Sequence, residues 1–144
     1  TYATNGDKIY FIDMGVQSFL LAATLLGVLG QRLVRTICPY CKTAYQPSNA
    51  LLMQLGISPS LIGQQKFYTG ARCEKCAGTG YKGRKGIHEL LNVSDPIKEL
   101  ITENVPSLVL KQKAIELGMR TLREDGIQNI FEGNTTIEEV LKYT

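Results

Sequence analysis

The chain carries Cys38-Pro39-Tyr40-Cys41 and, after 31 intervening residues, Cys73-Glu74-Lys75-Cys76. Two thiolates separated by two residues can bind one metal ion, because the tight turn between them points both sulfurs to the same side. Two such pairs supply four thiolates at the corners of a tetrahedron. The sequence therefore predicts one closed metal site with Cys38, Cys41, Cys73 and Cys76 as its ligands.

The four-thiolate set favours zinc in a structural role, with no open position for a substrate. Iron in a rubredoxin-like tetrathiolate is the chemical competitor, and the cysteine spacing does not separate the two metals. Two disulfides or four free buried thiols are the remaining alternatives, and the paired CxxC spacing favours a metal over both. Structural zinc contributes on the order of 10 kcal/mol to small metal domains. Replacing one cysteine is therefore expected to unfold the small part of the chain that the four cysteines hold together.

Length and composition predict a globular protein that buries a core. The chain has 144 residues and a mass of 15.9 kDa, with 44% hydrophobic and 20% charged residues. Its net charge of +3 is weak support for a polyanionic partner. The longest apolar run, Phe19–Gly30, has 12 residues, whereas a bilayer-crossing helix needs roughly 18 to 20. The segment Thr1–Lys8 lacks the features of a secretory signal, so we expect a soluble, cytoplasmic protein.

The pattern of apolar, glycine and capping residues predicts an α+β fold that is mainly helical. Apolar residues at helical spacing predict a buried helix over Phe19–Leu33, and charged and apolar residues alternate as in a strand over Arg32–Ile37. Capping boxes at Thr121–Glu124 and Thr135–Glu138 mark two helix starts. Helices are also expected at 49–55, 59–62, 96–103, 107–117, 122–132 and 136–143, and strands at 66–69 and 87–93.

Three further signals favour structural over functional interpretations. Gly78–Gly83 has the spacing of a phosphate-binding loop, but Arg84 and Lys85 follow where that motif needs Lys and then Ser or Thr, so we predict turns. His88 is the single histidine and lies in an apolar strand, so no catalytic site is predicted. Basic residues near the second cysteine pair are interpreted as a solvated surface that offsets the thiolate charge, rather than as a nucleic-acid face. They are Arg72, Lys75, Lys82, Arg84 and Lys85, with Tyr68 and Tyr81 nearby in sequence.

Four segments occur together in this order: Ile12–Leu21, Leu26–Lys42, Gly80–Leu91 and Met119–Gly126. Together they resemble the secretion ATPases, and more specifically the C-terminal part of the assembly ATPases that drive type II secretion and type IV pilus extension. The motif order and the four-cysteine insertion agree with that branch. Pilus-retraction ATPases of the same superfamily lack the insertion. The resemblance covers roughly residues 12 to 144.

The resemblance implies three regions and a mechanical role. Residues 1–36 would be the edge of a RecA-like motor domain, residues 37–85 a four-cysteine zinc subdomain, and residues 86–144 a C-terminal helical subdomain. Family members form hexamers, hydrolyse ATP and move an inner-membrane platform protein. A cytoplasmic protein that associates peripherally with the inner membrane through its partners is therefore implied.

The nucleotide machinery of the family is missing from this sequence. No Walker A or Walker B sequence occurs in it, and Ala3 stands where the family has a histidine. We assign no catalytic role to residues 1–11. The chain is expected to be a non-catalytic C-terminal fragment that does not hydrolyse ATP alone, with ATP and magnesium bound only in a motor core outside it.

A hypothesis of a different class is a free-standing zinc-ribbon module that binds nucleic acid or unfolded protein. Cys73–Gly80 fits the CxxCxGxG repeat and resembles the zinc region of the Hsp40 chaperones, whereas Lys42–Tyr45 contains no glycine. The apolar segment 19–30 counts against such a module, because a larger domain is needed to bury it. No nucleic-acid partner is therefore expected.

Overall fold

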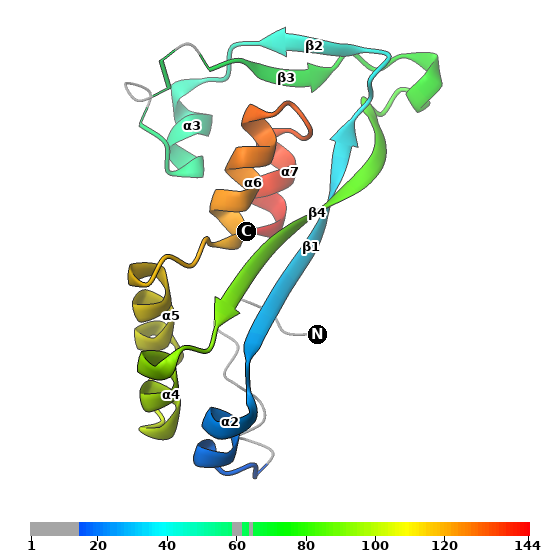
Figure 1. Cartoon of the computed structure of the whole chain (residues 1–144). Helices are drawn as coiled ribbons and strands as arrows, with labels where there is room; N and C mark the ends of the chain where they lie inside the picture. Colours follow the sequence, from blue (N-terminus) through cyan, green and yellow to red (C-terminus); the bar gives the residue numbers. More distant parts are fainter. Residues whose placement is uncertain (1–14, 59–61, 64) are drawn as a thin grey trace. The chain divides into compact units, whose positions relative to one another are not determined.

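The computed structural model describes residues 15–58, 62–63 and 65–144. They form two compact units, each built from two separate stretches of chain. The first unit contains the residues up to Gln31 and His88–Leu122, and the second contains Arg32–Ile87 and Arg123–Thr144. Strands β1 (Gly27–Ile37) and β4 (Tyr81–Asn92) pair with each other and run antiparallel in Figure 1. Each of these two strands contributes residues to both units.

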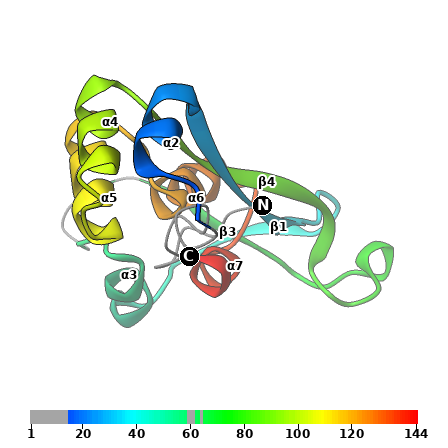
Figure 2. The ribbon, with the colours of Figure 1, turned by 90° about the horizontal axis from the view of Figure 1, so that it is seen from below.

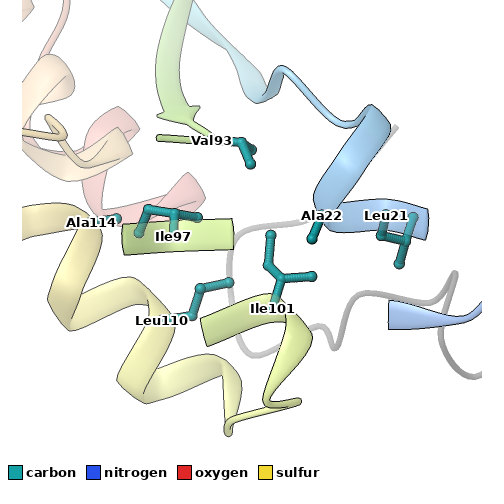
Figure 3. Close-up of a cluster of buried hydrophobic side chains, with 7 residues drawn as sticks. All are labelled: Leu21, Ala22, Val93, Ile97, Ile101, Leu110 and Ala114. Atoms are coloured by element: carbon teal, nitrogen blue, oxygen red, sulfur yellow. The ribbon is translucent and has the colours of Figure 1, made fainter. Parts of the chain in front are cut away.

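The first unit packs three helices around an apolar cluster. These are α2 (Ser18–Thr24), α4 (Asp95–Thr102) and α5 (Ser107–Glu116), and α4 and α5 lie side by side in Figures 1 and 2. Ile97 and Ile101 recur at helical spacing on α4 and are 0% and 2% exposed, so this helix supplies the centre of the cluster. Figure 3 shows the cluster, which consists of Leu21, Ala22, Val93, Ile97, Ile101, Leu110 and Ala114.

The predicted buried helix over Phe19–Leu33 is wrong in its second half, and in its first half Phe19 and Leu20 are exposed. The helix ends at Thr24, Leu25 is already extended, and β1 begins at Gly27. Along β1 buried and exposed residues alternate: Val34 is fully buried, whereas Leu33 is exposed. Glycine has low helix propensity, and this stretch contains Gly27 and Gly30. Pairing with β4 satisfies the backbone of β1, so the long-range contact overrides the apolar spacing.

The second unit combines a small sheet with three helices. Strands β2 (Lys42–Tyr45) and β3 (Phe67–Gly70) are antiparallel, with Lys42 opposite Gly70 and Tyr45 opposite Phe67. The helices are α3 (Asn49–Leu55), α6 (Leu122–Phe131) and α7 (Ile137–Tyr143), and a short 3-10 turn, η2, spans Glu74–Cys76. The core of this unit consists of Leu52, Leu55, Phe67, Ile130, Ile137 and Val140.

A buried carboxylate joins the end of β1 to α7. Glu139 is 2% exposed and accepts three hydrogen bonds from Arg35: one from its backbone N–H at 2.9 Å and two from its guanidinium at 2.9 and 2.6 Å. Burial opposes ionisation, but the hydrogen bonds and charge of Arg35 outweigh it and lower the pKa of Glu139 below its ordinary value. Thr135 also donates to the Arg35 carbonyl at 2.8 Å. The pair therefore fixes α7 against the strand that leads into the first cysteine turn.

Most of the other expected elements are confirmed. Helices α3 to α7 agree with the predicted helices at 49–55, 96–103, 107–117, 122–132 and 136–143 to within one or two residues. The strands predicted at 66–69 and 87–93 correspond to β3 and to part of the longer β4. Most of the short helix expected at 59–62 lies outside the described residues. The fold is α+β, and no helix in the part of the chain that the structure describes has the length and apolarity to cross a membrane.

Candidate metal centre

The four cysteines lie on two tight turns of the second unit. Cys38 follows β1 directly, and the N–H of Cys41 donates to the Cys38 carbonyl at 3.3 Å, which closes the first turn. In the second turn the N–H of Cys76 donates to the Cys73 carbonyl at 3.2 Å, and Ala77 then adopts a left-handed conformation with φ 50°. Each turn points its two sulfurs to one side, as the sequence spacing predicts.

The sulfur atoms form a compact cluster. All four Sγ atoms lie within 4.8 Å of one another. The Cys38–Cys73 and Cys41–Cys76 sulfurs are 3.9 Å apart, and the Cys73–Cys76 sulfurs are 3.8 Å apart. A tetrahedron with metal–sulfur bonds of about 2.3 Å has edges of about 3.8 Å. The donor set therefore has the size and chemistry to hold one metal ion.

The two disulfides that the sequence left open are not formed in this structure, where all four cysteines are free thiols. A disulfide needs sulfurs about 2.05 Å apart, and the shortest of the sulfur separations given above is 3.8 Å. Cys38 and Cys76 are buried, and Cys41 and Cys73 are half-buried. Two of the four cysteines are thus shielded from solvent, and the other two are partly accessible.

Backbone hydrogen bonds tie the two turns together. The N–H of Cys38 donates to the Gly80 carbonyl at 2.9 Å, and the N–H of Ala71 donates to the Cys41 carbonyl at 2.8 Å. The N–H of Gly80 in turn donates to the Cys76 sulfur at 3.2 Å. Amide donors of this kind orient a thiolate ligand and stabilise its charge.

The close approach of two glycines makes this arrangement possible. A Cβ atom added at Gly70 would lie 2.0 Å from the Gly80 carbonyl oxygen and 2.6 Å from its Cα. No side chain can move aside there, because the obstacle is backbone. Gly70 ends β3 two residues before Arg72 and three before Cys73, so this contact sets the distance between the second turn and the sheet. Sequence reasoning missed Gly70; its only signal was a glycine between a strand and a cysteine pair.

The thiols do not ionise alike. Burial opposes ionisation of Cys76, but the Gly80 amide and the three neighbouring thiols outweigh it and lower the pKa of Cys76 to about 7. Burial, together with its neighbours, raises the pKa of Cys73 to about 11. The Cys76 sulfur receives the amide hydrogen bond from Gly80, which stabilises its thiolate form.

Aromatic and basic side chains surround the two turns. Tyr40, between the first two cysteines, is 59% exposed, and its ring centroid lies 4.3 Å from the Lys75 ammonium and 5.0 Å from the Lys82 ammonium. The Arg35 guanidinium stacks over Tyr81 at 4.1 Å, and the Tyr81 hydroxyl is 2.9 Å from the Thr136 hydroxyl. Cations at these positions partly offset the negative charge of a metal-bound thiolate cluster.

The remaining sequence signals have structural outcomes. Gly78 and Gly80 have φ values of 73° and 81° and lie in the predicted turn, whereas the turn predicted to continue through Gly83 is wrong, because β4 begins at Tyr81 and contains Gly83. His88 lies on β4 and is exposed rather than buried. It is not among the residues gathered at the four cysteines.

The family described as type II/IV secretion system protein matches residues 7–142. The chain belongs to this family. The match includes both cysteine turns and all the helices and strands described above except the last residue of α7. It confirms the resemblance to secretion ATPases that the sequence motifs indicated.

Curated relatives come from both branches of the type II/IV secretion family. The type IV pilus assembly ATPase PilB of Thermus thermophilus is 47% identical over 132 residues, which are 92% of this chain and 15% of that protein. The type II secretion system protein E of Dickeya dadantii is 40% identical over 132 residues, 92% of this chain and 26% of that protein. The type II secretion system ATPase E of Vibrio cholerae is 40% identical over 134 residues. The chain thus spans about a quarter or less of the length of these relatives.

Proposed function

We propose that this chain is the metal-bearing C-terminal part of a hexameric ATPase that powers type II protein secretion or type IV pilus assembly. The main support for this proposal is the cluster of four sulfurs within 4.8 Å of one another in a chain of the type II/IV secretion family. The parent protein would work in the cytoplasm against an inner-membrane platform protein. ATP and magnesium would bind in its motor core, outside these residues.

The bound ion would be a single structural zinc held by Cys38, Cys41, Cys73 and Cys76. When bound, it supplies a covalent-strength cross-link between the two turns and leaves no position for a substrate. The chain's own residues orient and shield the ligands: the Gly80 N–H donates to the Cys76 sulfur at 3.2 Å, and Cys38 and Cys76 are buried from solvent. Iron fits the same four sulfurs, and the experiment below separates the two metals.

The metal would have a mechanical role in the parent ATPase, because it would hold the first cysteine turn and the end of β1 in place. Residues 37–85, the proposed zinc subdomain, lie wholly within the second unit together with α7. Cys38 follows β1, which also holds Glu139 of α7 through Arg35. A metal that fixes the first turn therefore also fixes the end of β1. In the parent ATPase, residues 1–36 would edge the motor domain and residues 86–144 would form the helical subdomain.

Native mass spectrometry of the chain tests the metal site, because it reports metal identity, metal number and oligomeric state together. We expect one zinc ion per chain, and loss of that ion in Cys38→Ser and in Cys76→Ser, each with a lower melting temperature. Thr43→Ser, at an exposed position on β2, is the matched control and should keep both the metal and the melting temperature. A metal-free chain with the mass of two disulfides, or cysteine variants that melt like the parent chain, would rule out the structural zinc.

The proposal about the parent protein needs a second experiment in the longer chain. We expect Cys38→Ser, introduced there, to reduce hexamer formation and ATP hydrolysis together, while Thr43→Ser changes neither. Native mass spectrometry and a phosphate-release assay measure the two effects. Normal hexamers and normal ATP hydrolysis in a protein that has lost its zinc would show that neither assembly nor activity depends on the metal site.

A further inference from the structure

The segment that carries the cysteines has a strongly asymmetric charge. Residues 37–85 contain seven Lys and Arg residues and one acidic residue, Glu74, a net charge of +6, although the whole chain carries only +3. The rest of the chain is therefore acidic, with nine basic and twelve acidic residues. Four thiolates and one divalent ion would still leave the segment at +4. This excess is larger than neutralisation of the metal cluster requires.

Only some of these cations have partners within the chain. Lys85 pairs with Glu132 at 3.5 Å, and Lys42 lies over the Tyr68 ring at 4.4 Å. Five others form no ion pair with any carboxylate in the described part of the chain, and all five are exposed. They are Lys66, Arg72, Lys75, Lys82 and Arg84.

The two cysteine turns bring two of these cations onto one aromatic ring. Tyr40 comes from the first turn, Lys75 from η2 inside the second turn, and Lys82 from the start of β4. Both ammonium groups lie within 5.0 Å of the Tyr40 ring centroid, in an exposed position. Two like charges held this close repel each other, so an incoming anion is stabilised by both. We call Tyr40, Lys75 and Lys82 the basic turn surface.

We propose that the basic turn surface is the docking site for an acidic polypeptide segment, rich in Asp and Glu, of a partner protein. Lysine ammonium groups bind carboxylates as point charges and steer an acidic partner toward the surface. Two lysine ammonium groups lie within 5.0 Å of the centroid of the exposed Tyr40 ring, and they compete with a nucleic-acid base for stacking on that ring. Besides Tyr40, Met53 on α3 is the one exposed large apolar side chain among the described residues of 37–85, too few to anchor a membrane-inserting face.

This inference rests on the proposed metal site, since the metal would hold the two turns that present the three side chains. The test uses zinc-loaded chain and a fluorescein-labelled oligo-glutamate peptide, with binding measured by fluorescence anisotropy at low and high salt. We expect Lys75→Glu and Lys82→Glu each to weaken binding by on the order of fivefold, which is about 1 kcal/mol per substitution. Lys66→Glu is the matched control: it makes the same charge change in the same segment but precedes β3 at the end away from Gly70.

Each outcome decides the question. A Lys66→Glu variant as weak as Lys75→Glu would show a general charge effect and overturn the docking site. Tighter binding to phosphatidylglycerol vesicles or to single-stranded DNA, lost in Lys75→Glu, would assign the surface to that other class and overturn the acidic partner. Native mass spectrometry of every sample keeps the two proposals apart: zinc-loaded chain that ignores the peptide overturns this inference alone, whereas chain that never holds metal overturns both.

Discussion

Replacing Gly70 by alanine should disrupt the metal centre without touching a ligand. The new Cβ atom would lie 2.0 Å from the Gly80 carbonyl oxygen, and real Cβ atoms essentially never approach closer than 3.0 Å. Gly70 and Gly80 would therefore have to separate by about 1 Å. The colliding atom of Gly80 is a backbone atom, so it cannot move aside by a change of side-chain rotamer.

The size of the effect of Gly70→Ala depends on which metal ligands a shift of Gly80 displaces. Gly80 accepts the Cys38 N–H and donates to the Cys76 sulfur, so a shift there disturbs one ligand from each turn. Metal–sulfur distances tolerate deviations of about 0.2 Å, far less than 1 Å. Overpacking of this kind typically costs 1–3 kcal/mol, and we expect a loss of about 3 kcal/mol in unfolding free energy. Zinc affinity should fall by about tenfold or more, since each tenfold change corresponds to 1.4 kcal/mol.

The control is Gly78→Ala, in the same lobe. Gly78 has φ 73° but a Cβ there would meet nothing within 4 Å, so the change adds backbone strain of roughly 1–2 kcal/mol without a collision. Urea denaturation of the zinc-loaded chain measures stability, and competition with a chromophoric chelator measures zinc affinity. We expect Gly70→Ala to lose more of both than Gly78→Ala. Equal effects in the two variants would refute the argument that the Gly70–Gly80 approach sets the geometry of the cluster.

Three further changes test other parts of the fold. Glu139→Gln should lower the unfolding free energy by about 1–3 kcal/mol at neutral pH. Because folding depresses the pKa of Glu139, this difference between the two proteins should be fully present above the unfolded pKa and should disappear as the pH falls through the folded pKa. Urea titrations of both proteins at several pH values measure it. Gly126→Ala would place a Cβ 2.5 Å from a Val140 methyl and should cost about 1–3 kcal/mol, much of it recovered in the double variant with Val140→Ala; a double variant no better than the single one would contradict this. Ile97→Ala should destabilise the first unit by about 2–5 kcal/mol while zinc affinity, measured by chelator competition, stays unchanged.

Local chemistry made several elements predictable. Helix α7 begins within one residue of its predicted start, but the capping box predicted at Thr135–Glu138 is wrong by one position. The Thr136 hydroxyl accepts the Glu139 N–H, because Thr135 instead donates its hydroxyl to the distant Arg35 carbonyl. The two cysteine pairs likewise predicted turns, because two residues between thiolates leave little other choice. The prediction that the two cysteine pairs lie together in space also required the assumption that they share one metal ion. The cluster of four sulfur atoms is consistent with that assumption.

Predictions failed where distant residues decide the outcome. Leu26, Leu29 and Leu33 have the spacing of a helix, yet they lie in or next to β1, because β4 satisfies the hydrogen bonds of that backbone. No local signal in Gly27–Ile37 reveals a partner more than forty residues away. The Arg35–Glu139 pair was missed for the same reason, since 104 positions separate its members.

The sequence by itself determined the chemistry of this protein: four thiols in two turns, the approximate bounds of α3 to α7, the basic character of residues 37–85, and the family to which they belong. Tertiary structure alone decided which surfaces these residues make. It paired β1 with β4, pressed Gly70 against Gly80, and placed Lys75 and Lys82 on the Tyr40 ring. The physical reason is range: turn and capping energies act within a few residues, whereas sheet pairing, close packing and charge clustering depend on which distant segments the fold brings into contact.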